Sequence, residues 1–278
     1  MSDSHDWHDW IGRTRTSSEV LDPEPARRLQ ATLGRPMSIA VGDPLPPAWH
    51  WLYFHDVALA GDLGGDGHPR LGVFMPPVPL PRRMWAGGRL EFHAPLVLGE
   101  RAERTSTFTA IDEKHGRSGS LIFVTVDHEI RQDGQRCVTE RQDIVYREMP
   151  DLTAPAAAVP AEPPPTDATL RDEYRLDSTA LFRYSALTFN GHRIHYDADY
   201  CRQVEGYPGL VVHGPLIATL LLDLAHRHDR PLGRFTYRAK SPLFAGASFT
   251  VNGRADDGGT DLWATNEGGG LAMQARAD

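Results

Sequence analysis

A Pro- and Ala-rich segment over residues 149–169 divides the 278-residue chain into two parts of similar length. Three consecutive prolines within it favour an extended connection, because proline lacks a backbone N–H and has a fixed φ angle. Each part has the length of an ordinary domain. The sequence therefore predicts an N-terminal domain over residues 1–150, a linker over 151–169 and a C-terminal domain over 170–278.

The first part has the pattern of one short helix followed by strands. Asp22 before Pro23 is typical of a helix N-cap and first helical residue, and Gly34 can end that helix. Alternating apolar residues predict four strands, over 89–96, 104–111, 120–130 and 136–147. The pair Asp133-Gly134 indicates a hairpin turn. The Pro-rich stretch over residues 76–81 is predicted to be a loop around a binding crevice.

The second part repeats this order in outline, which suggests duplication of one α+β fold. An extended run is expected to reach Leu187, and a short helix is predicted to begin near Asp197, whose carboxylate can cap it. A long helix is predicted from about residue 214 to about 228, because apolar residues recur there at helical spacing. Further strands are predicted over 234–239, 248–254, 262–266 and 271–275. Each part is therefore expected to pack helix against antiparallel sheet.

Composition excludes several classes of protein. No apolar run approaches the roughly 18 residues that span a bilayer, so a membrane protein is not expected. The acidic and aromatic N-terminus differs from a secretory signal, which favours a cytoplasmic location. Cys137 and Cys201 lie in different parts, so neither a disulfide framework nor a cysteine metal cage is expected. A net charge of −8 argues against a broad basic surface for nucleic acid.

Residues 182–218 contain the strongest candidates for chemistry. Asn190, His192 and His195 share one loop, and His213 precedes Gly214 at the start of the predicted long helix. A packed core avoids such a cluster, because each buried polar group must find a partner. Taken singly, a histidine is more often structural, and an asparagine is as often a turn residue as a functional one. Together they indicate proton transfer.

The glycine and the arginines near these residues have both structural and functional interpretations. The amide of Gly214 can stabilise negative charge at a helix start, although a glycine is also common in turns. Arg83 and Arg183 are either solvated surface groups or cations for an anionic ligand. His192 and His195 match no familiar zinc spacing, so no metal site is expected. Residues 64–67 lack the lysine of a phosphate loop and are predicted to be a turn.

The run Asn-Gly-His-Arg-Ile-His-Tyr-Asp over residues 190–197, followed by His213-Gly214, resembles the hydratase signature of MaoC-like double-hotdog acyl-thioester hydratases and dehydratases. With residues 76–91, the resemblance is closer to the branch of mesaconyl-C(4)-CoA hydratases and type 2 hydroxyacyl-thioester dehydratases. It covers the chain from about Trp49 onward. It implies a double hotdog, with an antiparallel sheet wrapped around a helix in each half. The first half, which lacks such a histidine cluster, would shape the acyl pocket.

The resemblance also implies roles for individual residues. His195 matches the catalytic histidine of the family and is the expected main acid/base. Asn190 occupies the position of the family's aspartate and is expected to orient water, because an amide cannot take a proton. His192 is expected to be a supporting or alternative proton carrier. The amide of Gly214 is expected to polarise the thioester carbonyl.

The implied activity is reversible hydration of mesaconyl-C(4)-CoA to citramalyl-CoA, with the CoA thioester as substrate and no separate cofactor. Arg83 or Arg183 is the candidate for binding the free carboxylate of this substrate, and His213 is a further candidate for substrate binding. Four alternatives stay open: an itaconyl-CoA hydratase, a 3-hydroxyacyl-thioester dehydratase, a thioesterase and a non-catalytic acyl-CoA binding module. Two hotdogs in one chain can pair internally, and association into a homo-oligomer also stays open.

Overall fold

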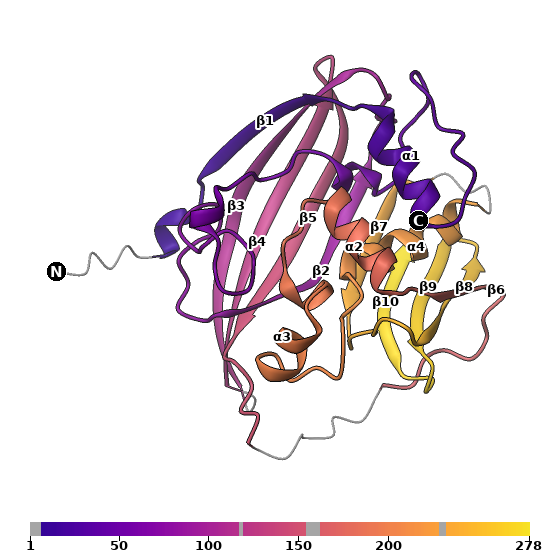
Figure 1. The fold of residues 1–278 in the computed structure, drawn as a ribbon. Helices are drawn as coiled ribbons and strands as arrows, with labels where there is room; N and C mark the ends of the chain where they lie inside the picture. The colour runs from indigo at the N-terminus through magenta and orange to yellow at the C-terminus, as the bar shows by residue number, and fades with distance from the viewer. Residues whose placement is uncertain (1–6, 117–118, 154–161, 228–231) are drawn as a thin grey trace.

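The computed structural model describes residues 7–116, 119–153, 162–227 and 232–278 (Figure 1). Ten strands of the described residues form one antiparallel sheet, in the order β1-β3-β4-β5-β2-β7-β10-β9-β8-β6. Their bounds are β1 Thr14–Val20, β2 Arg82–Phe92, β3 Arg101–Gly116, β4 Gly119–Gln132, β5 Gln135–Arg147, β6 Leu170–Arg175, β7 Arg234–Ala239, β8 Ser248–Asp256, β9 Gly259–Asn266 and β10 Leu271–Ala277. Helices pack on this sheet, so the predicted α+β class is confirmed.

The long helix of the second part lies against its strands. The α-helices are α1 (Pro23–Thr32), α2 (Ser178–Leu187), α3 (Ala198–Gln203) and α4 (Gly214–His226). The 3-10 helices are η1 (Trp7–Trp10), η2 (Trp49–Leu52), η3 (Ala60–Asp62) and η4 (Arg193–His195). Every side chain over residues 216–225 is buried, and α4 packs against β8, β9 and β10. The predicted helix is confirmed from its start at Gly214, while its predicted end at residue 228 lies outside the described residues.

Strands β2 and β7 join the two parts of the chain edge to edge, so that both sets of strands lie side by side in Figure 1. Glycines allow this close approach, since a Cβ atom at Gly87 would lie 2.7 Å from the backbone oxygen of Tyr237. The two parts therefore share one sheet, and their division into separate domains stays a prediction. Residues 151–153 and 162–169 of the proposed linker form neither helix nor strand, and 154–161 lie outside the described residues.

The first part contributes to two cores. Leu29 of α1 and Trp49 of η2 join the large core that surrounds α4. Strands β3 to β5 contribute to a second core, which includes Ile122, Val124 and Val78 of the Pro-rich loop. The short helix predicted in the first part is α1. It packs against α2 from the second part.

Several boundaries differ from the predictions. The strand predicted over 89–96 begins earlier, at Arg82, because residues 82–85 pair with β5. The extended run predicted to reach Leu187 is wrong beyond Arg175, since the chain turns into α2. Asp177 caps this helix by accepting a hydrogen bond from the N–H of Ala180, and one apolar face is buried. The predicted caps at Asp22 and Asp197 and the turn at Asp133-Gly134 are confirmed.

Candidate functional site

His195 lies at the end of η4, in the loop between α2 and α3. It is 5% exposed, and its Nδ1 atom lies 2.7 Å from the backbone oxygen of Val211. A carbonyl oxygen only accepts, so Nδ1 holds the proton and Nε2 keeps a lone pair in the neutral ring. Burial lowers the pKa of His195 to about 4, against a smaller opposing effect of the Val211 hydrogen bond. The imidazole is therefore neutral near pH 7 and can accept a proton at Nε2.

His213 is the N-cap residue of α4 and supports His195 from behind. The two rings stack with their centroids 3.6 Å apart, and Nε2 of His213 lies 2.8 Å from the hydroxyl of Ser185. His213 is fully buried and is not among the residues that line the site cavity. This placement differs from the predicted role in substrate binding, because the ring fixes the orientation of His195 instead of facing a ligand.

Gly214 begins α4 at a point where a side chain would not fit. A Cβ atom there would lie 2.6 Å from Cε3 of Trp85, whose ring stacks on Tyr237. The first amides of a helix have no partner within the helix, and the following residue, Pro215, has no N–H. The N–H of Gly214 is therefore a backbone donor at the positive end of the helix dipole. This position suits the predicted role in polarising a carbonyl, which stays a prediction.

The turn over residues 64–68 brings the first part of the chain against the histidine loop. The backbone N–H of Arg193 donates to the oxygen of Asp66 over 2.8 Å, and the Arg193 side chain donates to the oxygen of Gly65 over 3.0 Å. A Cβ atom at Gly67 would lie 2.0 Å from the backbone oxygen of Gly191. The two loops therefore touch through glycine backbones.

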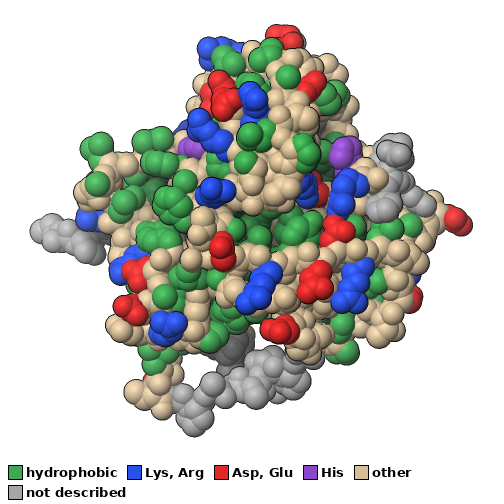
Figure 2. All heavy atoms as spheres, turned by 45° about the vertical axis from the view of Figure 1, so that its right-hand side comes forward, with side chains coloured by type: hydrophobic (Ala, Val, Ile, Leu, Met, Phe, Trp, Pro, Cys, Tyr) green, Lys and Arg blue, Asp and Glu red, His purple; other side chains and the backbone are tan. Residues whose placement is uncertain are grey.

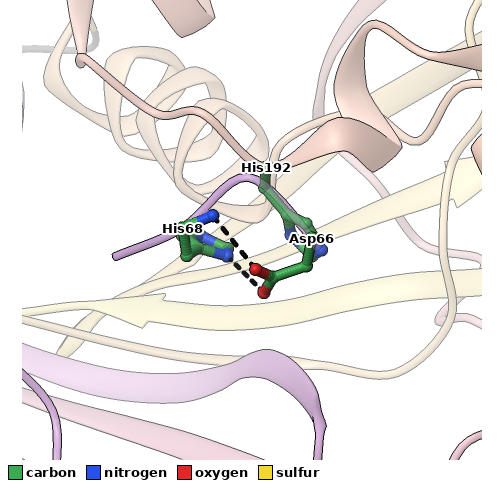
Figure 3. Close-up of side chains that lie close together, drawn as sticks. All are labelled: Asp66, His68 and His192. Carbon is green, nitrogen blue, oxygen red and sulfur yellow. Dashed lines mark hydrogen bonds and ion pairs between the residues drawn. The ribbon is translucent and has the colours of Figure 1, made fainter. Parts of the chain in front are cut away.

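This turn contributes two functional candidates that sequence reasoning missed. Nδ1 of His68 lies 2.9 Å from Oδ2 of Asp66, and the backbone N–H of His68 donates to Oδ1 over 3.1 Å (Figure 3). The ring of His68 lies 4.4 Å from the ring of His192, measured between centroids. The predicted turn is confirmed, but a histidine from the first half also joins the cluster. In the sequence, the only local sign of this pair is that Asp66 stands two residues before His68.

Burial keeps His68 and His192 neutral. It lowers the pKa of His68 to about 4, an effect that Arg83 increases and Asp66 opposes. The pKa of His192 is lowered far more, by burial and then by the charges of the neighbouring histidines and Arg83. For Asp66, burial is the largest effect and raises the pKa, but the hydrogen bond and charge of His68 outweigh it and leave the pKa low.

The same three side chains offer a possible geometry for a metal ion. One ligand atom from each of Asp66, His68 and His192 lies within 4.8 Å of the others. The Nδ1 atom of His68 and the Oδ2 atom of Asp66 already bind each other, so we do not identify the cluster as a metal site. The expectation that the protein holds no metal stays a prediction.

A cavity of about 780 Å³ connects these groups, and both halves of the chain line it. The walls include Trp85 from β2 and, from the second half, Asn190, His192, His195 and Gly214. The side-chain oxygen of Asn190 accepts a hydrogen bond from the backbone N–H of His192 over 3.0 Å. Its amide nitrogen can then donate to water or to a ligand. The four predicted catalytic residues therefore face one space.

Of the two candidate arginines, the structure brings only Arg83 to the cavity wall. Arg183 is exposed on α2 and does not line the cavity. The neighbouring Arg82 is buried, with its Nε atom 2.6 Å from a carboxylate oxygen of Glu205. Across the described ranges, no ion pair joins Arg83 to a carboxylate, so its charge can meet an anionic ligand.

The charge distribution on the surface and the state of the two cysteines agree with the predictions made from composition. On the face in Figure 2, basic and acidic side chains are interspersed and form no single broad basic patch. No helix within the described residues is long and apolar enough to cross a membrane. Cys137 and Cys201 are both buried and free.

The neutral buried histidines predict a loss of stability in acid. His68, His128 and His195 each have a pKa of about 4 in the folded protein, mainly because of burial, against about 6.5 when unfolded. The unfolded chain therefore binds more protons, and stability falls as the pH drops from about 6.5 to 4. Each group should cost roughly 2 kcal/mol at pH 5. Urea unfolding at pH 7, 6 and 5 measures this, and an unchanged midpoint would contradict it.

The chain is similar to known proteins in both sequence and fold. A family model described as hydroxyacyl-thioester dehydratase type 2 matches residues 48–245. The mesaconyl-C(4)-CoA hydratase of Chloroflexus aurantiacus is 46% identical over 277 residues, which cover 99% of this chain and 98% of that protein. A MaoC-like dehydratase structure from Phytophthora capsici has a TM-score of 0.69 and 12% identity, covering 97% of this chain and 95% of its own.

A Mycobacterium tuberculosis protein described as having a double hotdog fold is also similar. Its structure has a TM-score of 0.61 and 13% identity, and the match covers 98% of this chain and 96% of that one. At such low sequence identity the likeness concerns the fold alone. The predicted MaoC-like double hotdog is confirmed.

Proposed function

Because the chain belongs to the hydroxyacyl-thioester dehydratase type 2 family, we propose that it is a hydro-lyase that adds water reversibly to mesaconyl-C(4)-CoA and forms citramalyl-CoA. The main structural support is the position of neutral His195 beside the first turn of α4, on the wall of a cavity that both halves build. The name of the Chloroflexus relative supports the choice of substrate. The proposal requires no cofactor beyond the CoA thioester itself.

In the proposed reaction, three of the candidate residues each have one task. The N–H of Gly214 donates to the thioester oxygen, which gains negative charge as water adds to the double bond. Asn190 orients the water, and Nε2 of His195 removes one of its protons as the oxygen bonds to the β-carbon. The electron pair of the double bond moves toward the thioester, and the α-carbon then takes a proton. Dehydration is the same sequence in reverse.

Arg83 is assigned to the free carboxylate of the substrate, and its replacement should change specificity. In Arg83→Leu, kcat/KM for mesaconyl-C(4)-CoA should fall about 100-fold, because a charge-assisted contact is lost. The value for crotonyl-CoA, which has no second carboxylate, should change less than threefold by the same reasoning. Arg183→Leu is the matched control, since Arg183 lies outside the cavity lining. An equal loss with both substrates would reject the assignment.

The activity itself is tested by incubating the purified protein with mesaconyl-C(4)-CoA, itaconyl-CoA and crotonyl-CoA. Loss of enoyl absorbance with mesaconyl-C(4)-CoA as the best substrate supports the proposal. Preference for itaconyl-CoA, or for dehydration of 3-hydroxyacyl chains on acyl carrier protein, would replace the substrate but keep the hydro-lyase. Release of free thiol would indicate a thioesterase, and binding without turnover would indicate an acyl-CoA binding module.

A further inference from the structure

We propose that His68, oriented by Asp66, is the second acid/base of this site and exchanges a proton with the α-carbon of the substrate. This inference rests on the proposed hydration. Adding water moves two protons, because one leaves the water and another arrives at the α-carbon. His195 can accept the first, whereas Asn190 is an amide and cannot supply the second.

The geometry of His68 parallels that of His195. In each ring Nδ1 is held by an oxygen, from the Asp66 carboxylate in one case and from the Val211 backbone in the other. Both histidines line the same cavity, so both can present Nε2 to a ligand. The carboxylate of Asp66 adds a feature that His195 lacks, since a negative partner stabilises a protonated imidazole. His68 is therefore better suited to hold the proton that the α-carbon receives.

His192 fits this role less well, although it lies between the other two rings. Its ring centroid is 4.4 Å from that of His68 and 5.6 Å from that of His195. The hydrogen bond of Asp66 goes to His68, and burial, followed by the charges around His192, lowers the pKa of His192 further than that of His68. Its central position instead suits a relay that returns the proton from His195 to His68 after each turnover.

With these roles, the protons and electron pairs of each hydration balance. The water oxygen bonds to the β-carbon while its proton passes to Nε2 of His195, and the electron pair of the double bond moves to the α-carbon and the thioester oxygen. Protonated His68 transfers its proton from Nε2 to the α-carbon. Arg83 opposes protonation of His68 in the free protein, and a substrate carboxylate bound at Arg83 offsets that charge. Binding of a dicarboxylic substrate therefore favours the active protonation state.

The test uses His68→Gln and Asp66→Asn in the full chain, with the enoyl-CoA that the wild type hydrates fastest. For His68→Gln we expect kcat to fall about 100-fold or more with KM within threefold, because general acid/base groups act in the transition state. Asp66→Asn should retain more activity and shift the limb of the kcat–pH profile set by His68. The other charged or titratable neighbours of His68 are Arg83, His192 and His195. His68→Ala should regain activity when imidazole is added.

His226→Gln is the control and should keep the wild-type kcat, since His226 is an exposed histidine that does not line the cavity. If the wild type hydrates the substrate while His68→Gln keeps the wild-type kcat and pH profile, the inference fails and the proposed function stands. If the wild type hydrates none of the enoyl-CoAs, both fail. Loss of activity with a chelator, restored by a divalent cation, would also overturn the inference and assign the cluster to a metal ion.

Discussion

Replacing His195 with alanine is expected to lower kcat for hydration by about 10²- to 10⁴-fold, with little change in KM. The reason is that Nε2 of His195 accepts a proton only while water is adding, whereas binding of the thioester depends on other walls of the cavity. Steady-state rates with mesaconyl-C(4)-CoA measure the effect. Because the ring also stacks on His213, the thermal midpoint of each variant shows whether the protein stays folded.

Two further variants make this result specific. His195→Gln keeps most of the side-chain volume and can still donate to Val211, so it should fold like the wild type while losing the same catalysis. His226→Ala removes an exposed histidine at the opposite end of α4 and should leave kcat unchanged. Substantial activity in a folded His195→Gln protein would show that His195 is structural.

A single methyl group at Gly191 is expected to reduce kcat/KM roughly 100-fold, because a displacement of about 1 Å in a catalytic group can cost that much. A Cβ atom at Gly191 would lie 2.5 Å from the backbone oxygen of Gly67, and a backbone atom cannot rotate away. The φ angle of Gly191 lies outside the left-handed region, so the backbone itself tolerates alanine. The methyl group should therefore push the two loops apart and move His68 away from His192.

Gly65→Ala is the matched control on the opposing loop, since nothing lies within 4 Å of a Cβ atom there. It should keep wild-type activity. The unfolding midpoints of both variants show how much of any loss is due to stability, because overpacking typically costs 1–3 kcal/mol. Wild-type kinetics in Gly191→Ala would mean that the contact between the loops does not position the site.

Local sequence patterns predicted the elements that hold the second half of the site. The helical spacing of apolar residues placed α4 and its start at Gly214, and Asp197 indicated the start of α3. The helix α2 was missed, because its N-cap and buried face span only ten residues and follow a strand directly. Short apolar runs do not distinguish helix from strand by periodicity alone.

Long-range contacts could not be predicted in this way. The contact of Asp66 and His68 with the histidine loop depends on two glycines that let backbones from opposite halves touch. Nothing in either local sequence specifies that pairing. The same limit applies to His213 and Arg183, since the sequence places both near the motif but does not show that one lies behind His195 and the other outside the cavity.

The central claim is that this site adds water to the carbon–carbon double bond and leaves the thioester intact. The most direct measurement is mass spectrometry of the product formed from mesaconyl-C(4)-CoA in ¹⁸O-labelled water. The account predicts an intact CoA thioester with one ¹⁸O atom in a new hydroxyl group at the β-carbon, and no such product with His195→Gln. Label in a free carboxylic acid together with released CoA thiol would contradict it.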